Sequence, residues 1–335
     1  FGRYLKCKAG LRETTRRNYA YTYDHFVRNG LGKRKIAGMK YSDILCFYKD
    51  LLDEGIAVNT IDSVQTVLYP TFELAVKDDI IRKNPCLGAM GEIKRGCGRT
   101  GVARRALTRE QQKAFVRFLG EPGQLRWRPL FVVLIGTGCR IGEIIGVRWE
   151  DVDMENRMIH INHATTYIPG RSRGERARYV ISKPKTEMGS RSIPMVDEVY
   201  EALLEEKANQ GRLGIHCTQT VDGMSGFIFC NRFGNLLNPS SVNKAIKRIV
   251  SDYNLSEEVK AKKEHREANM LPMFSCHCLR HTFCTRLCET ETNIKAIQAI
   301  MGHADIETTM NIYAEATESM KQDAMKKFSD STDIF

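Results

Sequence analysis

Residues Ile135–Glu143 have the sequence IGTGCRIGE, and this stretch is the starting point for interpreting the chain. It places Arg140 in an otherwise apolar run, which is unusual because arginine is rarely buried without a partner. The charged or titratable side chains that follow it in order are Lys185, His277, Arg280, His303 and Tyr313. Each residue type is common, so the interpretation depends on the whole ordered set on a basic chain.

The cationic members of this set suit a phosphodiester. Breaking that bond without a metal requires a nucleophile, a proton acceptor, a proton donor and cations around the phosphoryl oxygens. Arg140 and Arg280 can donate forked N–H pairs to two phosphate oxygens. Lys185 beside a desolvated phosphate is a candidate acid for a departing 5′ oxygen.

The remaining members supply proton transfer and the nucleophile. Histidine titrates near neutrality, so His277 can accept the proton of Tyr313, and His303 can donate to a non-bridging oxygen. Residues 306–313 predict a short helix that returns the tyrosine hydroxyl toward His303. Attack by tyrosine gives an aryl phosphate ester, which keeps the energy of the broken phosphodiester bond. A freed hydroxyl can attack this ester and reverse the reaction, so we expect no cofactor.

The spacing places several of these residues at helix ends. His277 and Arg280 are three apart, so on one helix they share a face and can reach one phosphate. Pro272 lies upstream and residues 282–287 continue a helical pattern, so His277 is expected near a helix N-terminus, which favours an anion. The Gly302–His303 pair follows another helical pattern, and the glycine allows a sharp turn.

A metal site is the alternative for one cluster. His277, His281, Cys284 and Cys288 form a stripe at helical spacing. A helix rises about 16 Å over eleven residues, whereas zinc ligands lie about 2.0–2.3 Å from the metal. One zinc cannot bind all four, so we expect no metal here and predict that the two cysteines are apolar packing residues. The eleven cysteines are expected to be reduced thiols.

These segments together resemble the catalytic domain of the tyrosine recombinases, the phage integrase family, over most of residues 106–320. Ile135–Glu143 resembles the first box, and Pro184–Pro194 resembles the β-hairpin that carries the family's lysine. His277–Arg280 with Met301–Tyr313 resembles the second box. Every catalytic position of the pattern is occupied, and the hairpin is most similar to integrases of conjugative transposons and temperate phages.

The resemblance implies a site-specific DNA recombinase that cuts and rejoins strands through a 3′-phosphotyrosine intermediate, for integration and excision of a mobile element. Tyr313 would be the nucleophile, and Lys185, which directly precedes Thr186, is preferred over Lys183 as the hairpin lysine. It also implies a homotetramer on double-stranded recombination sites, with accessory DNA-bending or excision factors as further partners. A type IB topoisomerase, a telomere-resolving enzyme and a catalytically silent DNA-binding regulator are the alternatives.

Composition agrees with a nucleic-acid partner. The 335-residue chain has a net charge of +11, and residues 1–50 hold 12 Lys and Arg against 4 Asp and Glu. A polyanion is the simplest partner for such a surface, and a solubilising surface is the alternative. We find no pattern for a membrane span or signal peptide and expect a cytoplasmic, nucleoid-associated protein. A chain that begins at Phe1 is expected to be a fragment, with the presence of an N-terminal module left open.

The expected fold class is mainly α with a small antiparallel sheet (α+β). We expect a helical domain over 1–87, a basic, glycine-rich linker over 88–105, and a second domain with a helical tail over 106–335. The resemblance implies that the first is a core-binding domain and the second the catalytic domain. Predicted elements include helices at 14–28, 42–53 and 59–77, a capping box at 108–111, and strands at 157–162, 178–194 and 226–230.

Two segments are left open. Residues 253–269 are highly charged and fit either a solvated helix or an insertion. The tail carries an apolar stripe of Ala316, Met320, Ala324 and Phe328, which can dock in cis or on a neighbouring protomer. The sequence does not define the DNA target, transposon or phage origin, or the control of direction.

Overall fold

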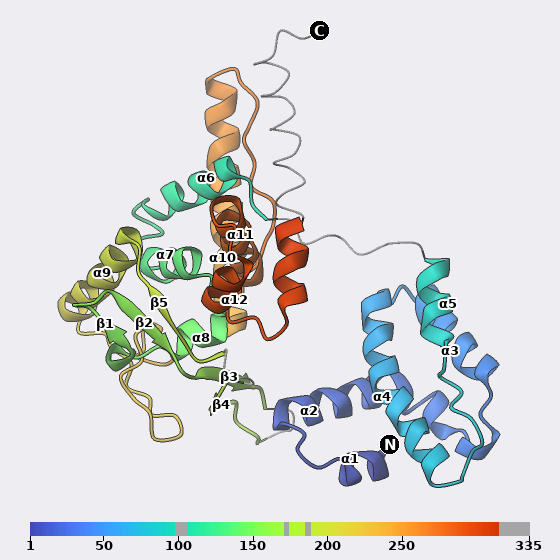
Figure 1. Ribbon diagram of the computed structural model, residues 1–335. Helices are drawn as coiled ribbons and strands as arrows, with labels where there is room; N and C mark the ends of the chain where they lie inside the picture. Colours follow the sequence, from blue (N-terminus) through green and yellow to red (C-terminus); the bar gives the residue numbers. More distant parts are fainter. Residues whose placement is uncertain (98–105, 171–173, 185–188, 315–335) are drawn as a thin grey trace. The chain divides into compact units, whose positions relative to one another are not determined.

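The computed structural model describes residues 1–97, 106–170, 174–184 and 189–314. The chain divides into two compact units, Phe1–Ala103 and Arg104–Phe335. Helices dominate both units, and the strands of the described residues form small antiparallel sheets in the second unit (Figure 1). The fold class expected from the sequence, mainly α with a small antiparallel sheet, is confirmed.

The first unit is built from short and medium helices. They are α1 (Gly2–Cys7), α2 (Glu13–Thr22), a π-helical turn (Tyr23–Val27), two 3-10 turns (Leu31–Lys33 and Ile36–Gly38), α3 (Tyr41–Asp53), α4 (Val58–Lys77) and α5 (Ala89–Gly96). α3 and α4 bury apolar side chains at helical spacing, including Ile44, Tyr48 and Leu51 from α3. The three helices expected in this region are present, the first as α2 with the π-helical turn.

The expected linker over 88–105 is wrong at its start. α5 lies inside that segment, and Ala89, Met90 and Ile93 are buried in the core of the first unit. Three small or medium apolar residues on one face are enough to dock a two-turn helix. The glycines and basic residues around them gave the segment a linker-like composition.

The second unit contains the remaining helices and all the strands of the described residues. Its helices are α6 (Arg109–Leu119), α7 (Arg128–Thr137), α8 (Ile141–Gly146), a 3-10 turn (Trp149–Asp151), α9 (Asp197–Leu213), α10 (Pro239–Lys263), α11 (Cys276–Thr290) and α12 (Ile294–Met301), followed by helical residues 306–314. The Thr108 side chain accepts the Gln111 backbone N–H at 3.2 Å and caps α6, which confirms the predicted capping box.

Among the described residues, five short strands form two antiparallel sheets. β2 (Met158–Ile161) pairs with β1 (Val152–Asp153) and with β5 (Arg191–Pro194), placing His160 opposite Ser192. β3 (Ala164–Ile168) pairs with β4 (Arg178–Ser182). β3 was not predicted. The strand predicted at 226–230 is wrong. Phe227, Ile228 and Phe229 are buried in the core, and the segment makes only isolated bridges, from Phe227 to Arg148 and from Cys230 to Leu236.

Packing around α7 brings the ends of several elements together. α7 contacts α9, α11, α6 and α8, while α12 contacts α11 and β5, and α8 contacts β3 (Figure 1). The charged segment at 253–269 is helical up to Lys263. Beyond the helix, the Arg266 guanidinium pairs with the Glu257 carboxylate with an N–O distance of 2.5 Å. No helix of the described residues has the length and apolar character to cross a membrane.

Candidate active site

Arg140 lies between two short helices. Gly138 ends α7 with a φ of 61°, a left-handed conformation that glycine adopts readily. α8 begins after Arg140, whose backbone N–H donates to the Glu143 carboxylate at 2.9 Å. The same carboxylate accepts an N–H of the Arg140 guanidinium at 2.8 Å. The Arg140 side chain remains 48% exposed, so it is anchored at its base and open to an incoming anion.

Arg280 projects from α11 and is buried. Its guanidinium donates to the carbonyl oxygens of Gly138 at 2.8 Å and Met301 at 2.7 Å. These carbonyls end α7 and α12, where the helix dipoles favour a cation. Burial, followed by the positive charge of Arg140, lowers the pKa of Arg280 to about 10, which leaves it charged at neutral pH.

His303 directly follows α12. Gly302 ends this helix with a φ of 62°, the sharp turn expected from the sequence. His303 is buried, and its Nδ1 lies 2.9 Å from the Thr309 hydroxyl. Burial, followed by the positive charges of Arg280 and Arg140, lowers the pKa of His303 to about 4. The imidazole is therefore neutral at pH 7.

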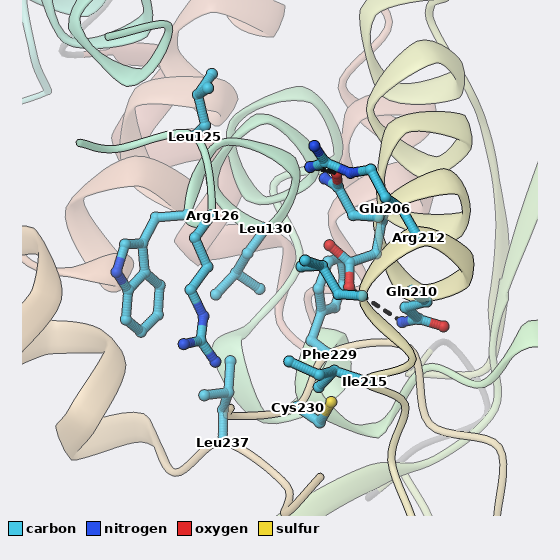
Figure 2. A pocket seen from close by; sticks show the side chains of 13 residues that line it. Leu125, Arg126, Leu130, Glu206, Gln210, Arg212, Ile215, Phe229, Cys230 and Leu237 are labelled. Atoms are coloured by element: carbon cyan, nitrogen blue, oxygen red, sulfur yellow. Dashed lines mark hydrogen bonds between the residues drawn. The ribbon is translucent and has the colours of Figure 1, made fainter. Parts of the chain in front are cut away.

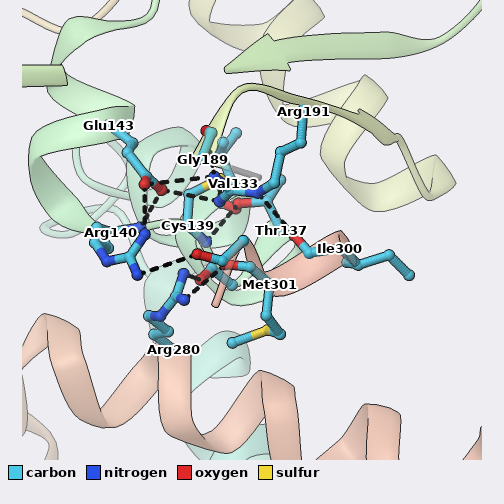
Figure 3. A network of polar contacts seen from close by, with 12 residues as sticks. Val133, Thr137, Cys139, Arg140, Glu143, Gly189, Arg191, Arg280, Ile300 and Met301 are labelled. Carbon is cyan, nitrogen blue, oxygen red and sulfur yellow. Dashed lines mark hydrogen bonds and ion pairs between the residues drawn. The ribbon is translucent and has the colours of Figure 1, made fainter. Parts of the chain in front are cut away.

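The buried carboxylate of Glu143 lies between the guanidinium groups of Arg140 and Arg191 (Figure 3). Glu143 accepts from the Arg191 guanidinium at 2.9 and 3.4 Å, besides its bonds from Arg140. Burial opposes ionisation of Glu143, but the hydrogen bond and charge of Arg191, followed by those of Arg140, outweigh it and lower the pKa of this carboxyl. With Arg280 nearby, three arginines face one carboxylate, so the cluster carries net positive charge.

A cavity of about 270 Å³ borders Arg280 and His303. Its lining includes a third predicted site residue, His277, which is exposed as the second residue of α11. The rest of the lining is His281, Met301, Thr308, Asn311 and Ile312. His277 therefore lies at a helix N-terminus, as expected, and borders the same space as the buried arginine and histidine.

Tyr313 lies on the helical segment 306–314 and is half-buried. It packs against the apolar cluster of Cys284, Cys288, Ile297 and Met301. Among the described residues, the cavity lining includes its neighbour Ile312 but not Tyr313 itself. The structure therefore groups Arg140, Arg280 and His303 at the C-terminal end of α12 and places Tyr313 on the next helical segment.

Lys185 lies outside the described residues, as does the tail stripe from Ala316 to Phe328. The hairpin is described up to Pro184, which follows β4, and again from Gly189, which precedes β5. The rival Lys183 is exposed on the β4 arm. The structure therefore positions both arms of the hairpin, and the role of Lys185 stays a prediction from the sequence.

A second cavity, of about 200 Å³, shares no lining residue with the first among the described residues (Figure 2). Its walls are largely apolar, with Arg126, Glu206 and Gln210 among them. Gln210 donates to the Ile228 carbonyl at 2.6 Å, and burial raises the pKa of Glu206. This cavity holds none of the residues predicted to act on a phosphate.

In the described part of the chain, no three His, Cys, Asp or Glu side chains are arranged to hold a metal ion. Cys284 and Cys288 are buried in an apolar cluster, which confirms their predicted packing role.

Sequence reasoning missed two residues of this network, Glu143 and Arg191. Both lie inside the quoted boxes but were assigned no role. Glu143 could have been found from its spacing, because an acid three residues after Arg140 on a helix is placed to pair with it. The partnership of Arg191 with Glu143 joins segments 48 residues apart, and no local pattern indicates it.

The comparisons with known proteins agree with this geometry. Residues 105–320 match the phage integrase family. The transposase of transposon Tn916 from Enterococcus faecalis is 33% identical over 321 residues, covering 95% of this chain and 73% of the transposase. A XerC-like tyrosine recombinase from Caldanaerobacter subterraneus is 26% identical over 322 residues, covering 92% of this chain and 76% of that protein.

Among solved structures, the Tn1549 transposon integrase in complex with transposon right end DNA has a TM-score of 0.81 and 29% identity, and the match covers 98% of each chain. The chain therefore belongs to the phage integrase family and is a site-specific tyrosine recombinase, a DNA strand transferase that acts in the integration and excision of a mobile element.

Proposed function

We propose that Tyr313 attacks the scissile phosphate of double-stranded DNA. A bond forms between the tyrosine oxygen and phosphorus, and the bond from phosphorus to the 5′ oxygen breaks, giving a 3′-phosphotyrosine and a free 5′ hydroxyl. His277 accepts the tyrosine proton or hydrogen-bonds to the phosphate, and Lys185 donates the proton that the 5′ oxygen takes up. A freed 5′ hydroxyl of the partner strand reverses these steps, so the reaction consumes no cofactor.

Arg140, Arg280 and His303 are proposed to stabilise the negative charge that develops on the non-bridging oxygens. The observation that carries this proposal is the meeting of the two boxes. The Arg280 guanidinium donates hydrogen bonds to carbonyl oxygens at the end of α7 and at the end of α12, and the Arg140 guanidinium donates to the Gly302 carbonyl at 3.3 Å. Residues some 140 positions apart in the chain thus present two guanidinium groups and a histidine together.

The neutral state of His303 supports a donor role. In the tautomer in which Nδ1 accepts from the Thr309 hydroxyl, the ring hydrogen lies on Nε2 and can be donated to a phosphate oxygen; this is the tautomer that the proposal assigns. A neutral donor adds a hydrogen bond without adding another positive charge to the three arginines nearby.

We further propose that the chain acts as a homotetramer on its recombination sites and that the first unit contributes DNA binding. The strongly basic composition of residues 1–50 and the solved complex of the Tn1549 integrase with DNA support this. The C-terminal tail is proposed to dock on a neighbouring protomer, with docking in cis as the alternative, and accessory DNA-bending or excision factors are proposed to set direction.

Covalent trapping tests the nucleophile. Wild type, Tyr313→Phe and Tyr200→Phe are incubated, in chelator, with nicked duplexes randomised around the cleavage position, and protein-linked DNA is counted after denaturation. Tyr200 is a matched control, because it is also half-buried in the second unit but packs under the Arg157 guanidinium.

Wild type and Tyr200→Phe should give linked DNA, and Tyr313→Phe should bind the same pool without forming the link. Linked DNA from Tyr313→Phe would contradict the assignment of the nucleophile.

A further inference from the structure

Arg191 uses all of its hydrogen-bonding capacity inside the protein. Its side chain is 6% exposed, and a guanidinium has five N–H donors. Nε donates to the Ile300 carbonyl at 2.8 Å, and the terminal nitrogens donate to both oxygens of Glu143, to the Gly189 carbonyl and to the Cys139 sulfur. A phosphate could bind Arg191 only by displacing one of these contacts, so Arg191 is unsuited to be a third phosphate clamp.

These contacts join three parts of the site. Gly189 belongs to the hairpin arm that leads into β5, Glu143 belongs to α8, and Ile300 belongs to the last turn of α12. The guanidinium also packs closely against Gly302, where an added Cβ would lie 2.8 Å from a terminal nitrogen of Arg191. Arg191 therefore contacts the segments that position the hairpin, Arg140 and His303.

The charge balance gives Arg191 a second role. Glu143 has a buried carboxylate with two arginine partners, one buried and one half-exposed. Leaving such a carboxylate without a cation is strongly unfavourable, because a buried charge then has no partner. If Arg140 were its sole partner, engagement of Arg140 by a phosphate would leave Glu143 unpaired. Because Arg191 stays bound to both carboxylate oxygens, Arg140 can engage a phosphate without this penalty.

We propose that Arg191 is a positioning residue for strand cleavage, which neutralises Glu143 so that Arg140 is available to the scissile phosphate and fixes the hairpin arm against the end of α12. The inference rests on the proposed roles of Arg140 and His303. It predicts a defect in the rate of cleavage and none in the affinity for DNA.

The test is single-turnover cleavage of a nicked duplex, captured from the trapping experiment, by Arg191→Lys. Lysine keeps the charge but lacks the planar fork, so it cannot hold both carboxylate oxygens and the Ile300 carbonyl in the same geometry. We expect cleavage to slow about 100-fold, the loss typical of a small misplacement of reacting groups, with the Kd for DNA unchanged. Arg157→Lys is the control, because Arg157 pairs with Asp197 on the surface of the same unit. It should cleave at the wild-type rate.

A double variant separates charge neutralisation from general structural damage. In Arg191→Met, the Glu143 carboxylate loses its remaining cation when Arg140 turns to the phosphate. Adding Glu143→Gln removes the negative charge of that carboxylate. We expect the double variant to cleave no more slowly than Arg191→Met alone, with folding of each checked by its unfolding midpoint in urea.

A wild-type rate for Arg191→Lys, or a double variant that cleaves more slowly than Arg191→Met alone, would overturn the proposal. Covalent linkage by Tyr313→Phe in the same assay would instead overturn the nucleophile assignment and leave the result for Arg191 interpretable.

Discussion

The low pKa of His303 predicts a specific loss of stability in mild acid. The folded protein disfavours protonation of this buried ring, with a pKa of about 4 against an ordinary value of about 6.5. Between these values the unfolded chain binds more protons than the folded chain, so stability falls as the pH drops. From pH 7 to pH 5, linkage gives a loss of about 2 kcal/mol from this one residue.

Comparison with His303→Gln isolates that contribution, because glutamine stays neutral and the other groups titrate in both proteins. The measurement is the free energy of unfolding in urea at pH 7 and pH 5, followed by tryptophan fluorescence. Both tryptophans of the chain, Trp127 and Trp149, lie in the second unit with His303, so fluorescence reports on the relevant unit.

Wild type should lose about 2 kcal/mol relative to His303→Gln over this range. A difference that stays constant between the two pH values would refute the assignment of His303 as a buried neutral group. A phosphate beside the ring would add negative charge and raise its pKa, so saturating DNA should reduce the acid sensitivity.

Three further predictions concern caps and charge. Gly138→Ala and Gly214→Ala both place alanine at the C-terminal end of a helix, at a position with a positive φ. The two differ in packing: an added Cβ at Gly138 would lie 2.2 Å from the ring of Phe283, whereas nothing lies within 4 Å of the corresponding Cβ at Gly214. Urea unfolding should therefore show Gly138→Ala less stable than Gly214→Ala by about 1–3 kcal/mol; equal losses would contradict the packing argument. Thr108→Ala should cost about 1 kcal/mol in the same assay through loss of the α6 cap. The Kd for a DNA duplex, measured by fluorescence anisotropy, should rise steeply between about 50 and about 200 mM salt, and insensitivity to salt would argue against a phosphate-dominated interface.

The sequence predicted those features whose cause is local. The capping box at Thr108, the turn at Gly302 and the helix start before His277 each depend on a few adjacent residues, and the structure has all three. Arg140, Arg280 and His303 are brought together by the fold.

The features that were missed depend on tertiary packing. α5 consists of residues whose composition resembles a linker, and it is helical where Ala89, Met90 and Ile93 dock into the first unit. Residues 226–230 are apolar because they fill the core, and they pair with no extended strand. The role of Arg191 likewise depends on where Glu143 and Ile300 lie in space.

Two of the proposed catalytic groups, Arg140 and His303, lie at the ends of helices, and this makes the site sensitive to insertions and deletions in a way that substitutions do not reveal. Arg140 caps α8, and His303 follows Gly302, the residue that caps the C-terminal end of α12. One residue added within α12 would turn everything beyond it by about 100° and advance it by about 1.5 Å. Such a change of helical register would point His303 away from the arginines even if every side chain were retained. Among homologous chains, length variation should therefore gather in the loops and spare α8 and α12.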